Sequence, residues 1–438
     1  MLGGGTFVTA GSKILPGSYI NFVSAARASA SLSNRGIAAV PFVMDWGPDG
    51  EIFTIERSEF TKTALAVLGF DATHEKLKNF REVFKNAKTL IAYKLNADGV
   101  KASNTFFTAK YGGVRGNDLK TVITANVDTP ANFDVKTLLG DVVVDVQTVA
   151  AATGLVANDF ATPKTGATLV LTAGTALTGG TNGTAVAGAN YTAYLAKLEQ
   201  YSFNTLACPG TDDTIAQVFD AFTKRMRDEM GVKFQTVRYK TATAPNHEGV
   251  IVVENTVTDA GAAADSLIYW VAGAQSGCEL SRSLTNVNYD GEYVIGVNYT
   301  QTQLENFIKA GKLAFHRVGQ EINVLTDINS LTTFTEAKNS DFSSNQTIRV
   351  LDQTGNDIAS LFNTKYLGKI QNDAAGRTSF WADVVAYNQT LEQMRAIQSF
   401  DPDSVIVEQG EKKSSIVVGY NVQPTNVMEQ LYATIVVE

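Results

Sequence analysis

Hydrophobic and polar positions change period several times along the chain, and each change predicts a different kind of element. Residues 57–69 and 72–87 have apolar residues at helical spacing, the first stretch with a cap at Ser58 and a stop at Gly69. The apolar face of the second helix comprises Leu77, Phe80, Val83 and Phe84. A buried type of strand follows at 89–95, so this region predicts helices packed on a sheet.

A different pattern of hydrophobic and polar residues extends from about Ala97 to Asn190, where helical periodicity is scarce. Short alternating runs occur here between glycine, asparagine and proline turn signals, at 121–127, 132–138, 141–149 and 167–174. Strands at this spacing predict a small sandwich or barrel inserted into the chain. The Thr- and Gly-rich stretch 174–190 is expected to be an exposed loop.

Alternation of strands and helices then resumes. A strand at 203–210 precedes a helix from about Thr214 that Gly231 closes, and strands follow at 233–239 and 249–255. The apolar face of this helix comprises Ile215, Val218, Phe219, Phe222 and Met226. A β-α-β order of this kind favours a parallel sheet that is buried on both faces.

Another helix is expected near residue 302, where Thr302 and Glu305 match a capping box and Gly311 a C-terminal stop. The last part of the chain predicts two amphipathic helices and three strands, at 345–366, 378–400, 404–410, 415–424 and 431–438. The final strand, "LYATIVVE", presents unpaired backbone groups that need a partner.

The fold class is therefore α/β and α+β with several domains: a mixed α/β core with an inserted β-sandwich-like domain, a C-terminal α+β domain and extended arms at both ends. The expected boundaries are an N-terminal arm at 1–21, the α/β core at 22–96 with 197–310, the inserted domain at 97–196, the C-terminal domain at 311–422 and the arm strand at 423–438.

Composition and charge argue against several classes of function, including nucleic-acid binding and membrane insertion. The chain has 438 residues, 18% of them charged, with a net charge of -8 and a pI near 5.1, which argues against nucleic acid as a partner. No run approaches the roughly 18 apolar residues of a membrane span, so no membrane insertion is expected. The start lacks a signal-peptide pattern, which predicts synthesis in the cytosol. Cys208 and Cys278 fit neither a disulfide framework nor a zinc site and are interpreted as buried small apolar residues.

Candidate chemical groups are scattered. His74, His247 and His316 show no metal-ligand spacing. His316 is interpreted as structural. Ser276 lies one position too late for a nucleophile elbow, and its stretch predicts a turn after a buried strand.

Glycine-rich and acidic stretches have structural explanations too. The stretch 111–117 predicts a turn with positive φ, and the turn that holds Asp45, Asp49 and Glu51 is expected to be solvated. Asp212 and Asp213 are expected to cap a helix. The sequence therefore predicts no catalytic residue, no metal and no cofactor, and a protein that is not an enzyme.

Five stretches in the correct order carry a family resemblance: "GSKILPGSYINF" at 11–22, "SNRGIAAVPF" at 33–42, "AKYGGVRGND" at 109–118, "YWVAGAQSGCELSRSLTNVNY" at 269–289 and "MEQLYATIVVE" at 428–438. Together they resemble the tail sheath proteins of contractile bacteriophages and phage-like bacteriocins. The resemblance looks closest to the compact sheaths of phages and prophages of Gram-positive bacteria. It is weakest from about Val127 to Asn190.

The resemblance implies a structural subunit that self-assembles. Such sheaths polymerise as stacked hexameric rings around an inner tail tube protein, with baseplate and tail terminator proteins as further partners. The location implied is the tail of a virion or phage-like particle, assembled in the host bacterial cytoplasm. Contraction of the sheath then drives the tube through a cell envelope.

Both chain ends are implied to leave their own subunit and to pair with sheets of neighbouring copies, with flexible linkers around Pro16-Gly17 and Gln423-Pro424. The residues expected to make these inter-subunit contacts are Ile14, Tyr19, Phe22, Tyr432, Thr434 and Val436. The expected acceptor sheet contains Val405, Val407, Ile416 and Val418.

Two other functions stay open at this point. One is a non-contractile repeating shell or tube protein, although such proteins are usually richer in strands. The other is a nucleotide- or sugar-binding α/β enzyme, against which the acidic pair Asp212 and Asp213 counts because it would repel a phosphate.

Overall fold

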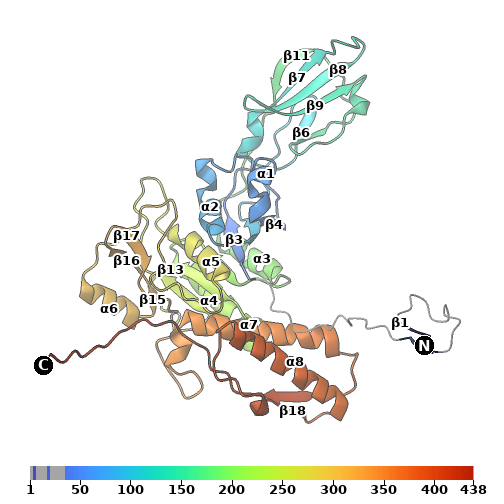
Figure 1. The fold of residues 1–438 in the computed structure, drawn as a ribbon. Coiled ribbons are helices and arrows are strands. Elements are labelled where there is room, and N and C mark those ends of the chain that lie inside the picture. Colours follow the sequence, from blue (N-terminus) through green and yellow to red (C-terminus); the bar gives the residue numbers. More distant parts are fainter. Residues whose placement is uncertain (1–2, 6–16, 20–34, 438) are drawn as a thin grey trace. The chain divides into compact units, whose positions relative to one another are not determined.

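The computed structural model describes residues 3–5, 17–19 and 35–437 (Figure 1). The described chain forms two compact units. The larger unit contains residues 35–354, 394–398 and 424–437, and the smaller unit contains residues 355–393 and 399–423 together with two short N-terminal strands. No helix in the described residues is long and apolar enough to span a membrane.

A seven-stranded sheet organises the larger unit, in the order β15-β14-β13-β12-β3-β5-β4. Its strands are β3 (Ile37–Phe42), β4 (Ile52–Glu56), β5 (Thr89–Lys94), β12 (Thr205–Cys208), β13 (Gln235–Tyr239), β14 (Val250–Val253) and β15 (Lys312–Leu313). Every neighbouring pair is parallel except β4 with β5. The central strands are buried along their whole length, which confirms the prediction of a parallel sheet covered on both faces.

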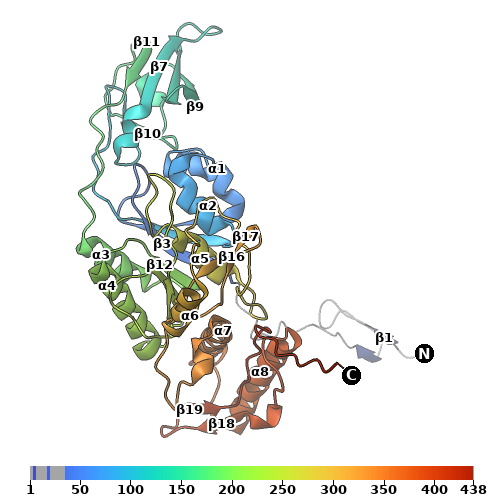
Figure 2. The same ribbon diagram turned by 90° about the vertical axis from the view of Figure 1, so that its left-hand side faces the viewer.

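Helices cover both faces of this sheet. One face carries α1 (Arg57–Leu68), η1 (Glu75–Leu77), α2 (Lys78–Phe84) and α5 (Leu267–Gly277), and the other carries α3 (Gly188–Leu198) and α4 (Asp213–Lys224). Figure 2 shows α3 and α4 on one side of β12 and α5 on the other. Alternate residues of one strand serve the two cores: Val40 packs with the first set of helices and Ala39 with the second.

Shorter elements complete the larger unit. They are the π-helical turn η4 (Arg225–Glu229), α6 (Gln301–Lys309), β16 (Phe315–Val318), β17 (Glu321–Val324) and η5 (Ser340–Ser343). Helix α7 (Asn345–Leu361) begins in the larger unit and ends in the smaller one. Cys208 is buried as predicted, whereas Cys278 is only half-buried.

Two helix caps differ from the sequence-based expectation. The residue before α1 is Glu56, whose side chain makes no cap hydrogen bond, so Ser58 is not the cap. The capping box of α6 is formed by Thr300 and Gln303, two positions before the expected pair. Asp212 caps α4 as expected, because its carboxylate accepts from the backbone N–H groups of Thr214 and Ile215.

The stretch around Ser276 is a helix, which corrects the prediction of a strand and a turn. Ten of the eleven residues of α5 are buried, so the stretch has no polar face to mark a helical period. A short apolar run of this kind has no distinguishing period, and burial between the sheet and α2 decides its conformation. Helix α3, which overlaps the end of the stretch expected to be β-rich, was also not foreseen.

The inserted region is β-rich, as predicted. Its strands are β6 (Phe107–Ala109), β7 (Leu119–Ala125), β8 (Phe133–Leu139), β9 (Val142–Val149), β10 (Ala161–Pro163) and β11 (Thr172–Ala176), with the short helices η2 (Val114–Asp118) and η3 (Ala152–Gly154). A four-stranded antiparallel sheet, β11-β7-β8-β9, and the pair β10-β6 enclose a separate apolar core that includes Phe107, Leu119 and Phe160.

The turn expected to be solvated is only partly so: Glu51 is exposed, whereas Asp45 and Asp49 are half-buried. Lys94, fully buried, lies 2.8 Å from an Asp49 carboxylate oxygen and donates to the carbonyl of Gly112 at 2.7 Å. Burial raises the pKa of Asp45, but hydrogen bonds from Lys76 and Asn182 outweigh it and lower the pKa below its ordinary value. These acidic groups therefore hold the β-rich insertion against the α/β core.

The smaller unit packs two helices on a hairpin. Its elements are the end of α7, η6 (Phe362–Tyr366), α8 (Ala374–Gln393), η7 (Pro402–Ser404), β18 (Ile406–Gln409) and β19 (Ile416–Gly419). The N-terminal strands β1 (Gly3–Gly5) and β2 (Gly17–Tyr19) pair in parallel. Phe380 and Val384 of α8 are buried in the core beside Val405.

Candidate assembly site

The C-terminal segment 431–437 belongs to no helix or strand of the described chain, although its residue pattern is that of a strand. All seven of its residues are exposed, including Thr434, and Tyr432 and Val436 are 88% and 81% exposed. An exposed run of large apolar side chains is uncommon on a soluble protein and marks an interaction surface. The segment is therefore a candidate for contact with another molecule.

The segment just before it, Pro424–Glu429, is attached to the larger unit. Pro424 forms a β-bridge with Ile397, and the Thr425 N–H donates to the Ala396 carbonyl at 3.0 Å. The Val427 N–H donates to Gln346 at 3.1 Å. The position of the chain end is thus fixed up to Glu429.

Glu429 makes the last of these contacts. One carboxylate oxygen accepts from the Thr285 hydroxyl at 2.7 Å and the other from the Thr326 hydroxyl at 3.0 Å. Thr285 also accepts the backbone N–H of Asp327 at 2.9 Å. The Thr285 hydroxyl therefore links Glu429, near the C-terminus, to the buried residue Asp327.

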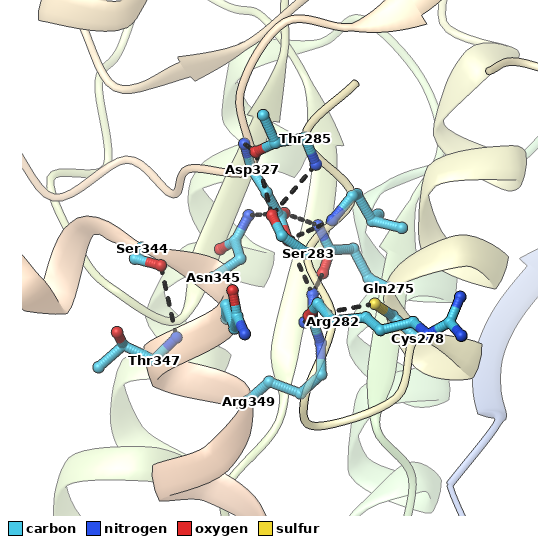
Figure 3. Close-up of polar contacts among 12 residues, drawn as sticks. Gln275, Cys278, Arg282, Ser283, Thr285, Asp327, Ser344, Asn345, Thr347 and Arg349 are labelled. Atoms are coloured by element: carbon cyan, nitrogen blue, oxygen red, sulfur yellow. Dashed lines mark hydrogen bonds and ion pairs between the residues drawn. The ribbon is translucent and has the colours of Figure 1, made fainter. Parts of the chain in front are cut away.

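Asp327 is the centre of a polar cluster inside the larger unit (Figure 3). One of its carboxylate oxygens accepts from the side-chain amides of Gln275 at 2.5 Å and Asn345 at 2.9 Å. The other accepts from the Leu284 N–H and from Arg349, both at 3.0 Å. Burial raises the pKa of Asp327, but Arg349 and these hydrogen bonds outweigh it, so the pKa is lowered and the carboxylate is charged.

Arg349 completes the cluster from α7. Its guanidinium donates to the Gln275 side-chain oxygen at 2.7 Å and to the Arg282 carbonyl at 2.8 Å. Gln275 therefore uses both ends of its amide, one toward Asp327 and one toward Arg349. We refer to Gln275, Asp327 and Arg349 as the central cluster.

The start of the continuous described stretch 35–437 is bonded to residues next to this cluster. Arg35, two residues before β3, donates to the backbone carbonyls of Gln275 and Cys278, each at 3.2 Å. A third bond, also of 3.2 Å, reaches the Gln353 side-chain oxygen on α7. These carbonyls lie at the C-terminal end of α5, where a cation is favourable because the helix dipole is negative there.

The expected acceptor residues form a hairpin in the smaller unit. β18 and β19 pair antiparallel, with Val407 opposite Val418. Val405 is buried, and Val407, Ile416 and Val418 are half-buried and pack on the helices of that unit. The hairpin therefore exists as predicted, with its apolar face toward α8.

The hairpin has two outer edges. The Gly410 N–H donates to the Ser415 carbonyl at 2.9 Å, and hydrogen-bonded and non-bonded pairs alternate in an antiparallel ladder. The backbone groups of Val407 therefore point outward on β18, and those of Ile416 and Val418 point outward on β19. Trp381 covers the start of the β18 edge because its ring N–H donates to the Val405 carbonyl at 3.0 Å.

A cavity of about 400 Å³ lies beside the start of β19 in the smaller unit. Apolar walls come from Phe362, Phe380 and Ile416, and Arg377 and Lys413 lie at its polar side. A cavity of this size has room for one or two aliphatic side chains. Of the residues of β19, Ile416 contributes to its lining.

One group of possible metal ligands occurs in the described residues, formed by Asp228, His247 and Glu248. Both imidazole nitrogens of His247 already have partners, the Gly249 N–H at 3.0 Å and Asp228 at 3.0 Å. Glu248 accepts from Lys338 at 2.6 Å. An ion-pair network explains these side chains without a metal.

Sequence comparison identifies the family. Four sheath models match in chain order: the Gp18 domain III N-terminal region at 35–95, the phage tail sheath protein beta-sandwich domain at 95–182, the central domain at 184–330 and the C-terminal domain at 337–438. The phage-like element PBSX protein XkdK of Bacillus subtilis (strain 168) is 33% identical over 98% of this chain and 99% of its own length. The chain belongs to the phage tail sheath protein family. The recognition made from sequence motifs is confirmed, and the protein is a structural component of a phage-type tail.

Solved structures agree with this assignment. The sheath tail protein from Desulfitobacterium hafniense is 37% identical, with a TM-score of 0.80 over 93% of this chain and 96% of that chain. The helical sheath of the anti-feeding prophage in its contracted state has the same fold, with 13% identity and a TM-score of 0.58 over 97% of this chain and 99% of that chain. The mixed α/β fold class with a β-sandwich domain is confirmed.

The predicted contact residues of this sheath protein are placed unevenly. Tyr19 lies in β2, while Ile14 and Phe22 lie outside the described residues. Tyr432, Thr434 and Val436 are together on the exposed C-terminal segment. Their contacts with another subunit stay a prediction.

The central cluster and its links to Arg35 and Glu429 were not foreseen. Of the cluster itself, the recognised motifs contain Gln275 but neither Asp327 nor Arg349. Arg35 lies in the motif at 33–42, Gln275 and Thr285 in the motif at 269–289, and Glu429 in the motif at 428–438. A charged or amide side chain inside an otherwise apolar motif was the available signal. The pairing of residues from three distant motifs could be read only from the folded chain.

Proposed function

We propose that this sheath protein polymerises as stacked hexameric rings around an inner tail tube protein, and that the polymer contracts to drive the tube through a cell envelope. Assembly takes place in the host bacterial cytoplasm, and baseplate and tail terminator proteins close the two ends. The observation that best supports this proposal is that segment 431–437 is exposed and rich in apolar residues, while Glu429, just before it, is held by hydrogen bonds to the larger unit. The contracted helical sheath formed by a structural neighbour supports the same assembly mode.

The proposed contact between subunits is strand addition. The backbone of segment 431–437 pairs with an outward edge of the β18–β19 hairpin of another copy, and the N-terminal arm with Ile14, Tyr19 and Phe22 joins the sheet of a neighbour. Backbone hydrogen bonds supply affinity and alternate side chains fix the register. A head-to-tail contact of this kind does not close on itself and propagates as a helix.

The two faces of the terminal strand differ, which gives the register. Side chains alternate along a strand, so Leu431, Ala433, Ile435 and Val437 share one wholly apolar face. Tyr432, Thr434 and Val436 share the other, mixed face. We place the apolar face toward α8 and the cavity beside β19, and the mixed face on the outer side of the same sheet.

The edge of β19 suits this role better than the edge of β18. Trp381 already occupies the Val405 carbonyl at the start of β18. The cavity beside Ile416 can receive Ile435 or Leu431 of the incoming strand. The domain division expected from the sequence, with arms at 1–21 and 423–438, is part of this proposal.

No catalytic step is included in the proposed function. Contraction would use energy held in the contacts between subunits, so no nucleotide is required. The α4 N-terminus, where a phosphate would bind in a nucleotide-binding fold, is occupied by the carboxylate of Asp212. This contact argues against the nucleotide-binding alternative.

Sedimentation of a truncated chain tests the proposal. Removal of Leu431–Glu438 should leave a folded protein that stays monomeric at concentrations where the full chain forms rings, tubes or polysheaths in negative stain. Circular dichroism checks the fold of the truncated chain. A full chain that remains monomeric at high concentration would contradict the proposal, as would collapse of the truncated fold.

A further inference from the structure

We propose that the central cluster joins the roots of the two arms, so that the body of each subunit holds both arms in one fixed relation and transmits load between them. The roots are Arg35 on the N-terminal side and Glu429 on the C-terminal side. This inference rests on the proposed strand exchange, since arms without partners carry no load. It assigns a positioning role to Glu429 and Arg35 rather than a contact with a neighbour.

The C-terminal link runs through one hydroxyl. Glu429 accepts from Thr285 at 2.7 Å, and the same hydroxyl accepts the Asp327 N–H at 2.9 Å. Thr326, the residue before Asp327, holds the second Glu429 oxygen at 3.0 Å. Both oxygens of the Glu429 carboxylate therefore accept hydrogen bonds, one from Thr326, next to Asp327, and one from Thr285, which is bonded to Asp327.

The N-terminal link runs through the end of α5. Arg35 donates to the Gln275 and Cys278 carbonyls, and the Gln275 side chain bridges Asp327 and Arg349. Every residue on the path from Arg35 to Glu429 is thus joined by a hydrogen bond to the next. Arg349 adds a second route because it lies on α7, the helix whose Gln353 side chain accepts a hydrogen bond from Arg35.

Burial makes this path stiff. Asp327 and Arg349 side chains are each 1% exposed, and the Gln275 residue is 1% exposed. Rearrangement of such a buried polar network would leave more of its polar groups without hydrogen-bond partners, which is costly. The two ends of the path are by contrast partly open to solvent, where the arms begin.

The position of Glu429 sets how far the free strand can reach. Residues 430–438 beyond it span about 30 Å when extended. Release of Glu429 would free the chain back to Val427, whose N–H still donates to Gln346, and lengthen this tether by roughly 7 Å. A longer tether lowers the effective concentration of the strand at its acceptor, and ordering it costs additional entropy.

Polymerisation of point variants tests the C-terminal root. Glu429→Ala should raise the critical concentration for assembly about tenfold, and Thr326→Val, which removes one donor at nearly constant shape, should raise it several-fold. The double variant should have the same critical concentration as Glu429→Ala alone, because both substitutions remove the same contact. Glu321→Ala on β17 removes an equally exposed charge and should leave assembly unchanged.

The same variants in the chain that lacks 431–438 separate the arm from the fold. There, Glu429→Ala and Thr326→Val should leave the unfolding midpoint of the monomer unchanged within a degree or two. A full chain that does not assemble at all would refute the proposed function. Normal assembly of both variants, or an equal loss of stability in the truncated monomer, would refute the positioning role and leave the proposed function standing.

Coupling between the two roots needs a double variant. Arg35→Ala and Glu429→Ala should be non-additive in critical concentration, the pair raising it less than the product of the single effects. Arg317→Ala, an exposed arginine on β16, is the matched control and should combine with Glu429→Ala multiplicatively. If Arg35→Ala and Glu429→Ala also multiply in their effects on the critical concentration, the two roots act independently and the proposed coupling is wrong.

Discussion

Asp327 and Arg349 form an ion pair of 3.0 Å in which each side chain is only 1% exposed. Removing two charges from water is costly, and the structure offsets this with hydrogen bonds from Gln275, Asn345 and Leu284 to the carboxylate. The pair is linked through Gln275 to Arg35 and through Thr285 to Glu429. Its placement suggests that stability and arm geometry depend on the same side chains.

Loss of one member of this pair should be costly. Asp327→Asn leaves the Arg349 charge buried without its partner, and the free energy of unfolding should fall by about 3–5 kcal/mol. Denaturant unfolding of the chain lacking 431–438 measures this without interference from assembly. Glu59→Gln, which breaks the exposed pair with Lys62, is the control and should have little effect. Equal effects of the two substitutions would contradict the importance of the buried pair.

The two faces of the terminal strand predict opposite responses to charge. Ile435→Asp would bury a carboxylate against the apolar helices of the neighbour and should abolish assembly at any practical concentration. Thr434→Asp places the same charge on the outer face and should raise the critical concentration only a few-fold. Sedimentation of both variants beside the full chain decides the register. A larger loss of assembly for Thr434→Asp than for Ile435→Asp would instead place Tyr432, Thr434 and Val436 on the buried face.

Gly113 should tolerate no side chain. Its φ is 143°, and an added Cβ would lie 1.9 Å from the Asp45 carbonyl oxygen. Gly113→Ala should therefore destabilise the protein by several kcal/mol, because it combines backbone strain with a steric clash. Gly140→Ala, at φ 62° with open space around it, should cost only about 1–2 kcal/mol. Thermal unfolding of the two variants gives the comparison.

Stability should depend on pH through His247. Burial lowers its pKa below the ordinary value near 6.5, although Glu248 and Asp228 oppose this. Since the unfolded chain then binds the proton at higher pH than the folded chain, stability falls as pH falls below about 7 and the loss is complete below the folded pKa.

His247→Gln removes this titration while keeping a donor for Asp228 and an acceptor for the Gly249 N–H. The free energy of unfolding of this variant, measured between pH 7.5 and 5.5, should fall less steeply than that of the parent chain. Identical slopes would show that His247 does not contribute to the pH dependence.

Sequence patterns were sufficient where a residue's role depends on its near neighbours. The parallel sheet, the helix capped by Asp212 and the β18–β19 hairpin all follow from local period, turn residues and burial preference. The family motifs were recognised for the same reason. Ser58 and the pair Thr302 and Glu305 were misassigned because a cap is defined by backbone geometry that neighbouring residues only suggest.

Tertiary structure decided the rest, because it depends on which distant residues meet. The buried apolar run of α5 has no period, and only packing between the sheet and α2 makes it a helix. Lys94 with Asp49, and Arg349 with Asp327, are separated by 45 and 22 positions, and nothing local links them. The sequence by itself determined that segment 431–437 has the residue pattern of a strand and is rich in large apolar side chains. The folded body determined that the chain is held up to Glu429 by Thr285 and Thr326, and that Thr285 is linked through Asp327 to Gln275, whose carbonyl binds Arg35, since hydrogen-bond geometry exists only once the chain is folded.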